Sequence, residues 1–130
     1  MKQAGFTLIE LLIVILMIGM VYSLILPYSQ SLLEKYQALR KAEEVKAYFL
    51  KKRAEAFLYG DKIELINRDG KIVASNNETF SLDRGKILME APIVFYPLGT
   101  TNGGVVRIVF SSITIELEIV PPFGEVKGQI

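Results

Sequence analysis

The residue types that this chain lacks limit the chemistry it could perform. Among its 130 residues there is no cysteine and no histidine. Disulfides, thiolate metal sites, cysteine nucleophiles and the Ser-His-Asp triad are therefore excluded, and the usual neutral-pH general base is missing. The serine, lysine, aspartate and glutamate residues that remain show no spacing that assembles a catalytic site. We expect neither enzymatic activity nor a bound metal or cofactor.

One acidic residue stands out because of its surroundings. Glu10 is the only charged residue in the run over 6–26, which reads FTLIELLIVILMIGMVYSLIL. A carboxylate near the centre of a membrane span costs roughly 2.5–3.5 kcal/mol on insertion scales, and less near an end of the span. An ionisable residue at this position predicts a function, although a side chain that reaches the membrane interface would also explain it.

Three other patterns suggest binding sites but have simpler explanations. The cluster Lys51, Lys52 and Arg53 could contact DNA, but nearby acidic residues favour a solvated helix face, and a net charge of +1 is not that of a general nucleic-acid binder. Asp69-Gly70 lacks the alternating oxygen ligands of a calcium loop, so we expect a tight turn. The glycine-rich stretch 99–104 precedes an expected strand, whereas a phosphate-binding loop precedes a helix.

A membrane span is the first element that would position Glu10. The apolar run has the roughly 20 residues that a helix needs to cross a bilayer. It is longer than the apolar core of a secretory signal peptide, and no small-residue cleavage site follows Pro27. We expect a transmembrane helix over 6–27, with Lys2 before it favouring a cytoplasmic N-terminus.

An amphipathic helix is expected over 28–60. Its apolar residues recur mostly at three- and four-residue steps, which is typical of a helix with one buried stripe. Pro27 predicts a bend between the two helical segments, and Gly60 predicts the C-terminal stop. The residues expected in the stripe are Leu32, Leu33, Tyr36, Leu39, Ala42, Val45, Phe49, Ala56 and Phe57.

A β domain is expected over 61–130. Short apolar runs predict strands at 62–66, 71–74, 78–82, 86–89, 93–96, 105–110 and 113–120. The first two strands form a hairpin around Asp69-Gly70. In the last strand apolar residues alternate with Thr114, Glu116 and Glu118, which predicts a sheet with one face in water.

The N-terminal motif resembles that of a known family. Gly5-Phe6-Thr7-Leu8-Ile9-Glu10, followed by the apolar run, resembles the class III signal of type IV prepilins and type II secretion pseudopilins. The resemblance implies that prepilin peptidase removes the leader 1–5 by cutting between Gly5 and Phe6 and then methylates the amine of Phe6. Glu10 would pair with a Phe6 amine, of a neighbouring subunit or of the same chain, and so set the register of a filament.

The C-terminal third is similar to the minor pseudopilin H (GspH) and FimT family. The matching segments are IVFYPLG at 93–99, NGGVV at 102–106 and IVPPFGEV at 119–126. The resemblance implies an α+β, pilin-like fold, in which one long helix packs against a C-terminal antiparallel β-sheet domain. It also implies a subunit anchored in the bacterial inner membrane, with the β domain in the periplasm or outside the cell.

The resemblance leaves two functions open. One is a minor pseudopilin at or near the tip of a type II secretion pseudopilus, with other major and minor pseudopilins, membrane lipid and a secreted protein as partners. The alternative is a FimT- or FimU-like minor type IV pilin in pilus assembly or DNA uptake. DNA capture would need a basic patch, and Glu125 lies where DNA-binding relatives tend to be basic, so we do not expect DNA as a partner. The patch residues would be Lys46, Lys51, Lys52, Arg53, Arg107 and Lys127.

Overall fold

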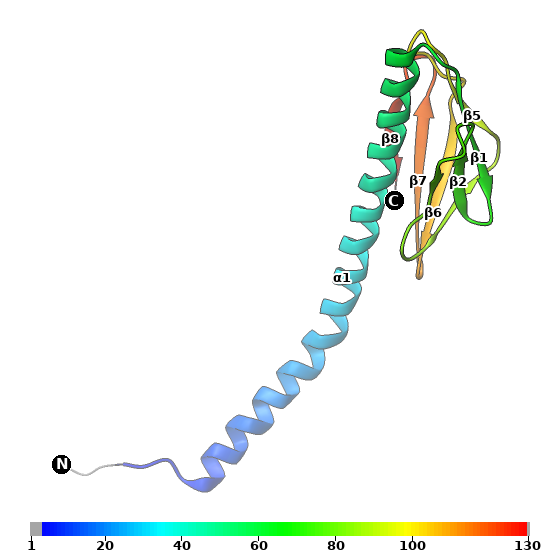
Figure 1. Ribbon diagram of the computed structural model, residues 1–130. Helices are drawn as coiled ribbons and strands as arrows, with labels where there is room; N and C mark the ends of the chain where they lie inside the picture. Colours follow the sequence, from blue (N-terminus) through cyan, green and yellow to red (C-terminus); the bar gives the residue numbers. More distant parts are fainter. Residues whose placement is uncertain (1–3, 130) are drawn as a thin grey trace. The chain divides into compact units, whose positions relative to one another are not determined.

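The computed structural model describes residues 4–129, so residues 1–3 of the expected leader lie outside the described residues. The chain divides into two compact units, of which the first ends at Lys35 and the second begins at Tyr36. One helix, α1 (Leu8–Tyr59), contributes residues to both units (Figure 1). The expected long N-terminal helix followed by an antiparallel β domain is confirmed, and the fold is α+β and pilin-like.

The helix ends where the sequence predicts. Gly60 follows the last helical residue and has a φ of +68°, a left-handed conformation that glycine adopts without the steric cost of a Cβ atom. Pro27 lies inside α1, where its ring removes one backbone hydrogen bond. The bend expected at Pro27 stays a prediction.

The second unit contains eight strands among the described residues. They form two antiparallel sheets of four strands, in the orders β3-β2-β1-β5 and β4-β6-β7-β8, where one sheet was expected. The seven predicted strands are present with small shifts at their ends, and β8 was not predicted. The strands are β1 (Ile63–Arg68), β2 (Lys71–Ala74), β3 (Thr79–Phe80), β4 (Lys86–Met89), β5 (Ile93–Phe95), β6 (Gly104–Phe110), β7 (Ile113–Val120) and β8 (Glu125–Gln129).

Two local predictions about the strands are confirmed. β1 and β2 pair as a hairpin, with Arg68 opposite Lys71. Asp69 and Gly70 between them have φ angles of +53° and +74°, as the two central residues of a type I′ turn require. Along β7 the burial alternates: Ile115, Leu117 and Ile119 are buried, while Thr114, Glu116 and Glu118 are exposed. β7 therefore has one buried face and one solvent-exposed face.

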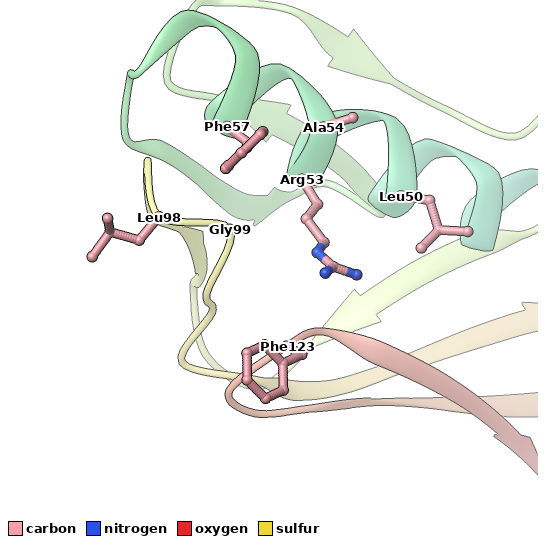
Figure 2. A pocket seen from close by; sticks show the side chains of 7 residues that line it. All are labelled: Leu50, Arg53, Ala54, Phe57, Leu98, Gly99 and Phe123. Carbon is pink, nitrogen blue, oxygen red and sulfur yellow. The ribbon is translucent and has the colours of Figure 1, made fainter.

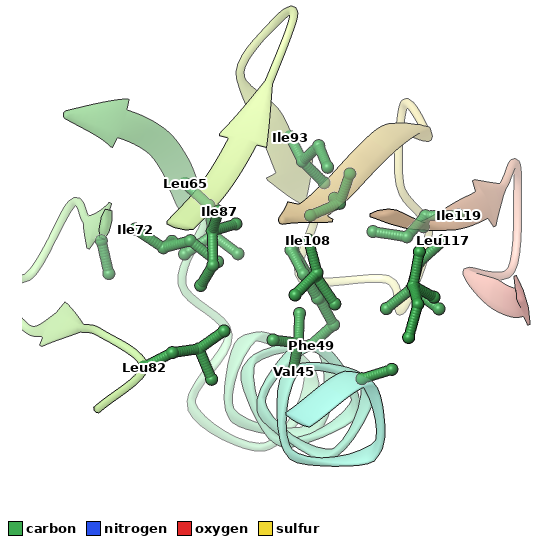
Figure 3. Close-up of a cluster of buried hydrophobic side chains, with 14 of the residues drawn as sticks. Val45, Phe49, Leu65, Ile72, Leu82, Ile87, Ile93, Ile108, Leu117 and Ile119 are labelled. Atoms are coloured by element: carbon green, nitrogen blue, oxygen red, sulfur yellow. The ribbon is translucent and has the colours of Figure 1, made fainter. Parts of the chain in front are cut away.

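The core of the second unit lies between α1 and both sheets. Figure 3 shows Val45 and Phe49 of α1 beneath side chains from each sheet, among them Leu65 and Ile108. Phe49 is 1% exposed, and burying a side chain of this size contributes about 1.5–3 kcal/mol. The positions of α1 that face this core are Ala38, Ala42, Val45, Phe49, Lys52 and Ala56.

The expected apolar stripe of α1 was only partly correct. The buried positions follow steps of four and three residues without a break, and this series includes Ala38 and Lys52, which were not predicted. Other expected members, such as Tyr36 and Phe57, lie outside the series and are exposed. The stripe was misplaced because apolar residues occur on more than one face of α1, and one core-facing position holds a lysine. The confirmed members are Ala42, Val45, Phe49 and Ala56, whereas Leu32, Leu33, Tyr36, Leu39 and Phe57 are exposed.

Candidate processing and assembly site

Three of the predicted site residues lie close together at the start of α1. Residues 4–7 have no regular structure and the helix begins at Leu8, so the peptide bond between Gly5 and Phe6 lies outside the helix. Phe6 is 88% exposed. Exposed backbone outside regular structure is where proteases cut most readily. Pro27 lies far along α1 and is not part of this cluster.

Glu10 takes part in a capping box with Thr7. The backbone N–H of Thr7 donates to Oε2 of Glu10 at 2.8 Å, and the backbone N–H of Glu10 donates to Oγ1 of Thr7 at 3.3 Å. Thr7 is thus the N-cap residue, and Glu10 occupies the third helical position, where a carboxylate also interacts favourably with the helix dipole. Our sequence reasoning missed the role of Thr7, although the T-x-x-E spacing that signals a capping box was present.

The first unit exposes apolar side chains on all sides of the helix. From Leu8 to Leu26 the large apolar residues are 46–83% exposed. By length and composition this part of α1 could cross a membrane. A helix that is apolar all round is stable when it is surrounded by other apolar groups, such as lipid tails or further helices. The apolar segment after the motif therefore supports membrane anchoring.

The structure corrects the interpretation of the Lys51–Arg53 cluster as a solvated helix face at Lys52, whereas Lys51 is exposed as expected. Lys52 is fully buried, and its Nζ donates to Oε2 of Glu55 at 2.8 Å and to Oε2 of Glu78. Burial on its own would lower the pKa of Lys52, but the hydrogen bonds to these carboxylates outweigh burial and raise it. The same ammonium group lies 5.5 Å from the centre of the Tyr48 ring, within cation–π range. Lys52 is thus a structural residue.

Arg107, another residue of the hypothetical DNA patch, is also held by acidic side chains. Its Nη1 lies 2.9 Å from Glu90 and its Nε donates to Glu116 at 3.2 Å. The hydrogen bond to Glu116 and the nearby charge of Glu90 raise the pKa of Arg107. Lys51 lies 3.8 Å from Glu55. Among the six residues of the hypothetical patch, Lys52 is buried, and Lys51 and Arg107 are paired with carboxylates.

Within residues 4–129 no three aspartate or glutamate side chains come together in a way that could hold a metal ion.

Comparison with known proteins identifies the N-terminal motif. The family described as the prokaryotic N-terminal methylation motif matches residues 1–25, which include Gly5, Phe6 and Glu10. No curated protein and no solved structure matches the chain. The motif implies processing by prepilin peptidase and assembly into filaments. Together with the long helix and the antiparallel sheets, the methylation motif indicates that the chain is a type IV pilin-like protein.

Proposed function

We propose that this chain is a minor pseudopilin of a type II secretion system, similar to GspH subunits, that helps to start assembly at or near the tip of the pseudopilus. The observation that carries the proposal is the start of α1. There the Gly5–Phe6 bond lies outside the helix, and a capping box holds Glu10 at its third position. The GspH-like segments at 93–126 favour the pseudopilin over a major pilin subunit.

Processing would convert the start of the helix into a charged terminus. Prepilin peptidase would hydrolyse the Gly5–Phe6 bond with one water molecule, leaving a carboxylate on Gly5 and an amine on Phe6. A methyl group would then pass from a sulfonium donor to the neutral amine, forming a C–N bond as the donor's C–S bond breaks and leaving a neutral thioether. The new terminus is an ammonium group next to Thr7, whose N–H already donates to Glu10. Cleavage thereby places a cation close to the Glu10 carboxylate in the first turn of the helix.

Glu10 would then direct the packing of subunits in the membrane. Opposite charges attract far more strongly in a low-dielectric environment than in water, so an unpaired carboxylate there favours contact with the Phe6 ammonium of a neighbour. The same ammonium could pair within its own chain, since Phe6 directly precedes Thr7, whose N–H donates to Glu10. Pairing between subunits would fix the axial register of the apolar helices in the filament core.

The span and the β domain would have separate tasks. Neighbouring helices would replace lipid around the apolar part of α1, with Pro27 allowing a bend where the helix leaves the core. The second unit would lie on the periplasmic side and contact other minor subunits and a secreted protein.

Deletion of the gene in its host would test the proposal against the alternative of a FimT- or FimU-like pilin. We expect secreted proteins to remain in the periplasm, surface pili and DNA uptake to be unchanged, and the wild-type gene to restore secretion. Glu10→Gln should fail to restore it, whereas Glu34→Gln, a matched change at an exposed glutamate further along α1, should restore it fully. Loss of pili or DNA uptake with secretion intact would replace the proposal by the alternative.

A further inference from the structure

The second unit contains an apolar hollow that the proposed function does not use. It has a volume of about 370 Å³ and lies between α1, the loop that joins β5 to β6, and the turn that joins β7 to β8 (Figure 2). We call it the Arg53 groove. Its lining residues are Leu50, Arg53, Ala54, Phe57, Leu98, Gly99 and Phe123.

The rim of the Arg53 groove exposes large apolar side chains. Leu98 is 84% exposed, Phe123 66% and Phe57 62%. Exposed apolar residues that gather in one place mark interaction surfaces more often than isolated ones do. The loops that carry Leu98 and Phe123 are also joined, since the N–H of Thr101 donates to the carbonyl oxygen of Pro122 at 2.8 Å. Binding of a partner would therefore cost little conformational entropy in these loops.

Arg53 supplies the one charged group in this apolar surface. Gly124 adopts a φ of +73°, and a Cβ atom there would lie 3.5 Å from Cδ of Arg53, so the turn packs directly against the arginine stem. The guanidinium extends from α1 toward Phe123 (Figure 2). Within residues 4–129, Arg53 has no ion-pair partner, whereas Lys51, Lys52 and Arg107 each have one or more. The donors of Arg53 remain available to a ligand.

We propose that the Arg53 groove binds a segment of another protein subunit that presents one carboxylate between apolar side chains. The guanidinium would bind the carboxylate through two parallel N–H···O hydrogen bonds, and the apolar rim would cover the flanking side chains. A nucleic-acid strand fits less well, because its affinity comes from several cations along the backbone, and the adjacent Lys51 and Lys52 already pair with carboxylates. This inference is independent of the processing of the N-terminus.

Binding of two matched peptides to the full chain in lipid nanodiscs would test the proposal. The probes are acetyl-Leu-(4-fluoro-Phe)-Asp-Leu-amide and the same peptide with Asn in place of Asp, followed by fluorine NMR. We expect the Asp peptide to bind with a Kd of about 1 mM or below, and about ten-fold more tightly than the Asn peptide. Arg53→Gln should remove this difference. Arg40→Gln, a matched change at an exposed arginine of the same helix, should keep it.

Three results would overturn the proposal. The first is equal binding of both peptides to the wild-type chain, and the second is the absence of saturable binding of either peptide. The third is displacement of the Asp peptide by a short thymidine oligonucleotide in the wild type but not in Arg53→Gln, which would make the groove a nucleic-acid site. Phe123→Ser should weaken the binding of both peptides by the same factor. An unchanged Tm of each variant would show that its fold is intact.

Discussion

Replacing Glu55 by glutamine should destabilise the second unit more than removing Lys52, the residue that Glu55 binds. Lys52 is fully buried, while 22% of the Glu55 side chain and 53% of the Glu78 side chain are exposed. Glu55→Gln leaves a buried ammonium with one carboxylate instead of two. We expect a loss of about 1–2 kcal/mol, between the ~0.2–1 kcal/mol of an exposed ion pair and the ~3–5 kcal/mol of a broken buried pair.

Lys52→Met should cost less, within about 1 kcal/mol, because methionine fills similar space and both carboxylates still reach water. Adding Lys52→Met to Glu55→Gln should therefore raise stability above that of Glu55→Gln alone. The assay is thermal unfolding of the full chain in detergent micelles, followed by near-ultraviolet circular dichroism of the tyrosines. For a unit of this size, 1 kcal/mol corresponds to a Tm shift of about 4–8 °C.

Lys51→Met is the matched control for these variants. Lys51 lies 3.8 Å from the same Glu55, but its side chain is 68% exposed, so we expect a loss below about 0.5 kcal/mol. The reasoning would be refuted if Lys52→Met lowered the Tm more than Glu55→Gln does. Additive losses in the double variant would refute it as well.

Three further predictions concern pH, a buried hydroxyl and the helix cap. Hydrogen bonding to Lys52 lowers the pKa of Glu78, so Glu78 should stabilise the fold near neutral pH. This contribution should be lost as the pH falls below about 4.3, the pKa of an unfolded glutamate, and through the lower pKa of the folded state. Measurement of the Tm against pH should show the loss of stability, and Lys52→Met should make that loss smaller. The Tyr48 hydroxyl is buried and has no hydrogen-bond partner among the described residues, so Tyr48→Phe should leave the Tm unchanged or raise it by up to the equivalent of about 1 kcal/mol. Thr7→Ala removes the oxygen that accepts from Glu10 and should weaken the first turn by about 1 kcal/mol, seen as roughly five-fold faster amide exchange at Glu10, whereas Thr7→Ser should not.

Most of the fold could be predicted because its signals are local. The apolar run, Gly60 and the Asp69-Gly70 turn each fix a short segment without help from distant residues. β8 was missed because Glu125-Val126-Lys127-Gly128 shows no apolar alternation. It forms because its residues pair with β7, with Val126 opposite Ile119 and Gly128 opposite Leu117. The division into two sheets likewise depends on which strands meet in space, which no single segment specifies.

The candidate sites could likewise be predicted only where their residues are neighbours in the sequence. Gly5, Phe6 and Glu10 are neighbours in sequence, so their motif could be recognised directly, and the Thr7–Glu10 capping box was equally readable. The burial of Lys52 could not be anticipated, because its partner Glu78 lies 26 positions further along the chain. The Arg53 groove was also missed, since its lining comes from three segments that only the folded chain brings together.

The measurement that tests the central claim most directly is the intact mass and N-terminal peptide map of the protein isolated from membranes, with and without active prepilin peptidase. A pilin-like subunit should begin at monomethylated Phe6 when the peptidase is present and should retain residues 1–5 when it is absent. A chain that keeps residues 1–5 in the presence of active peptidase would contradict the account and leave a membrane-anchored β domain outside any filament.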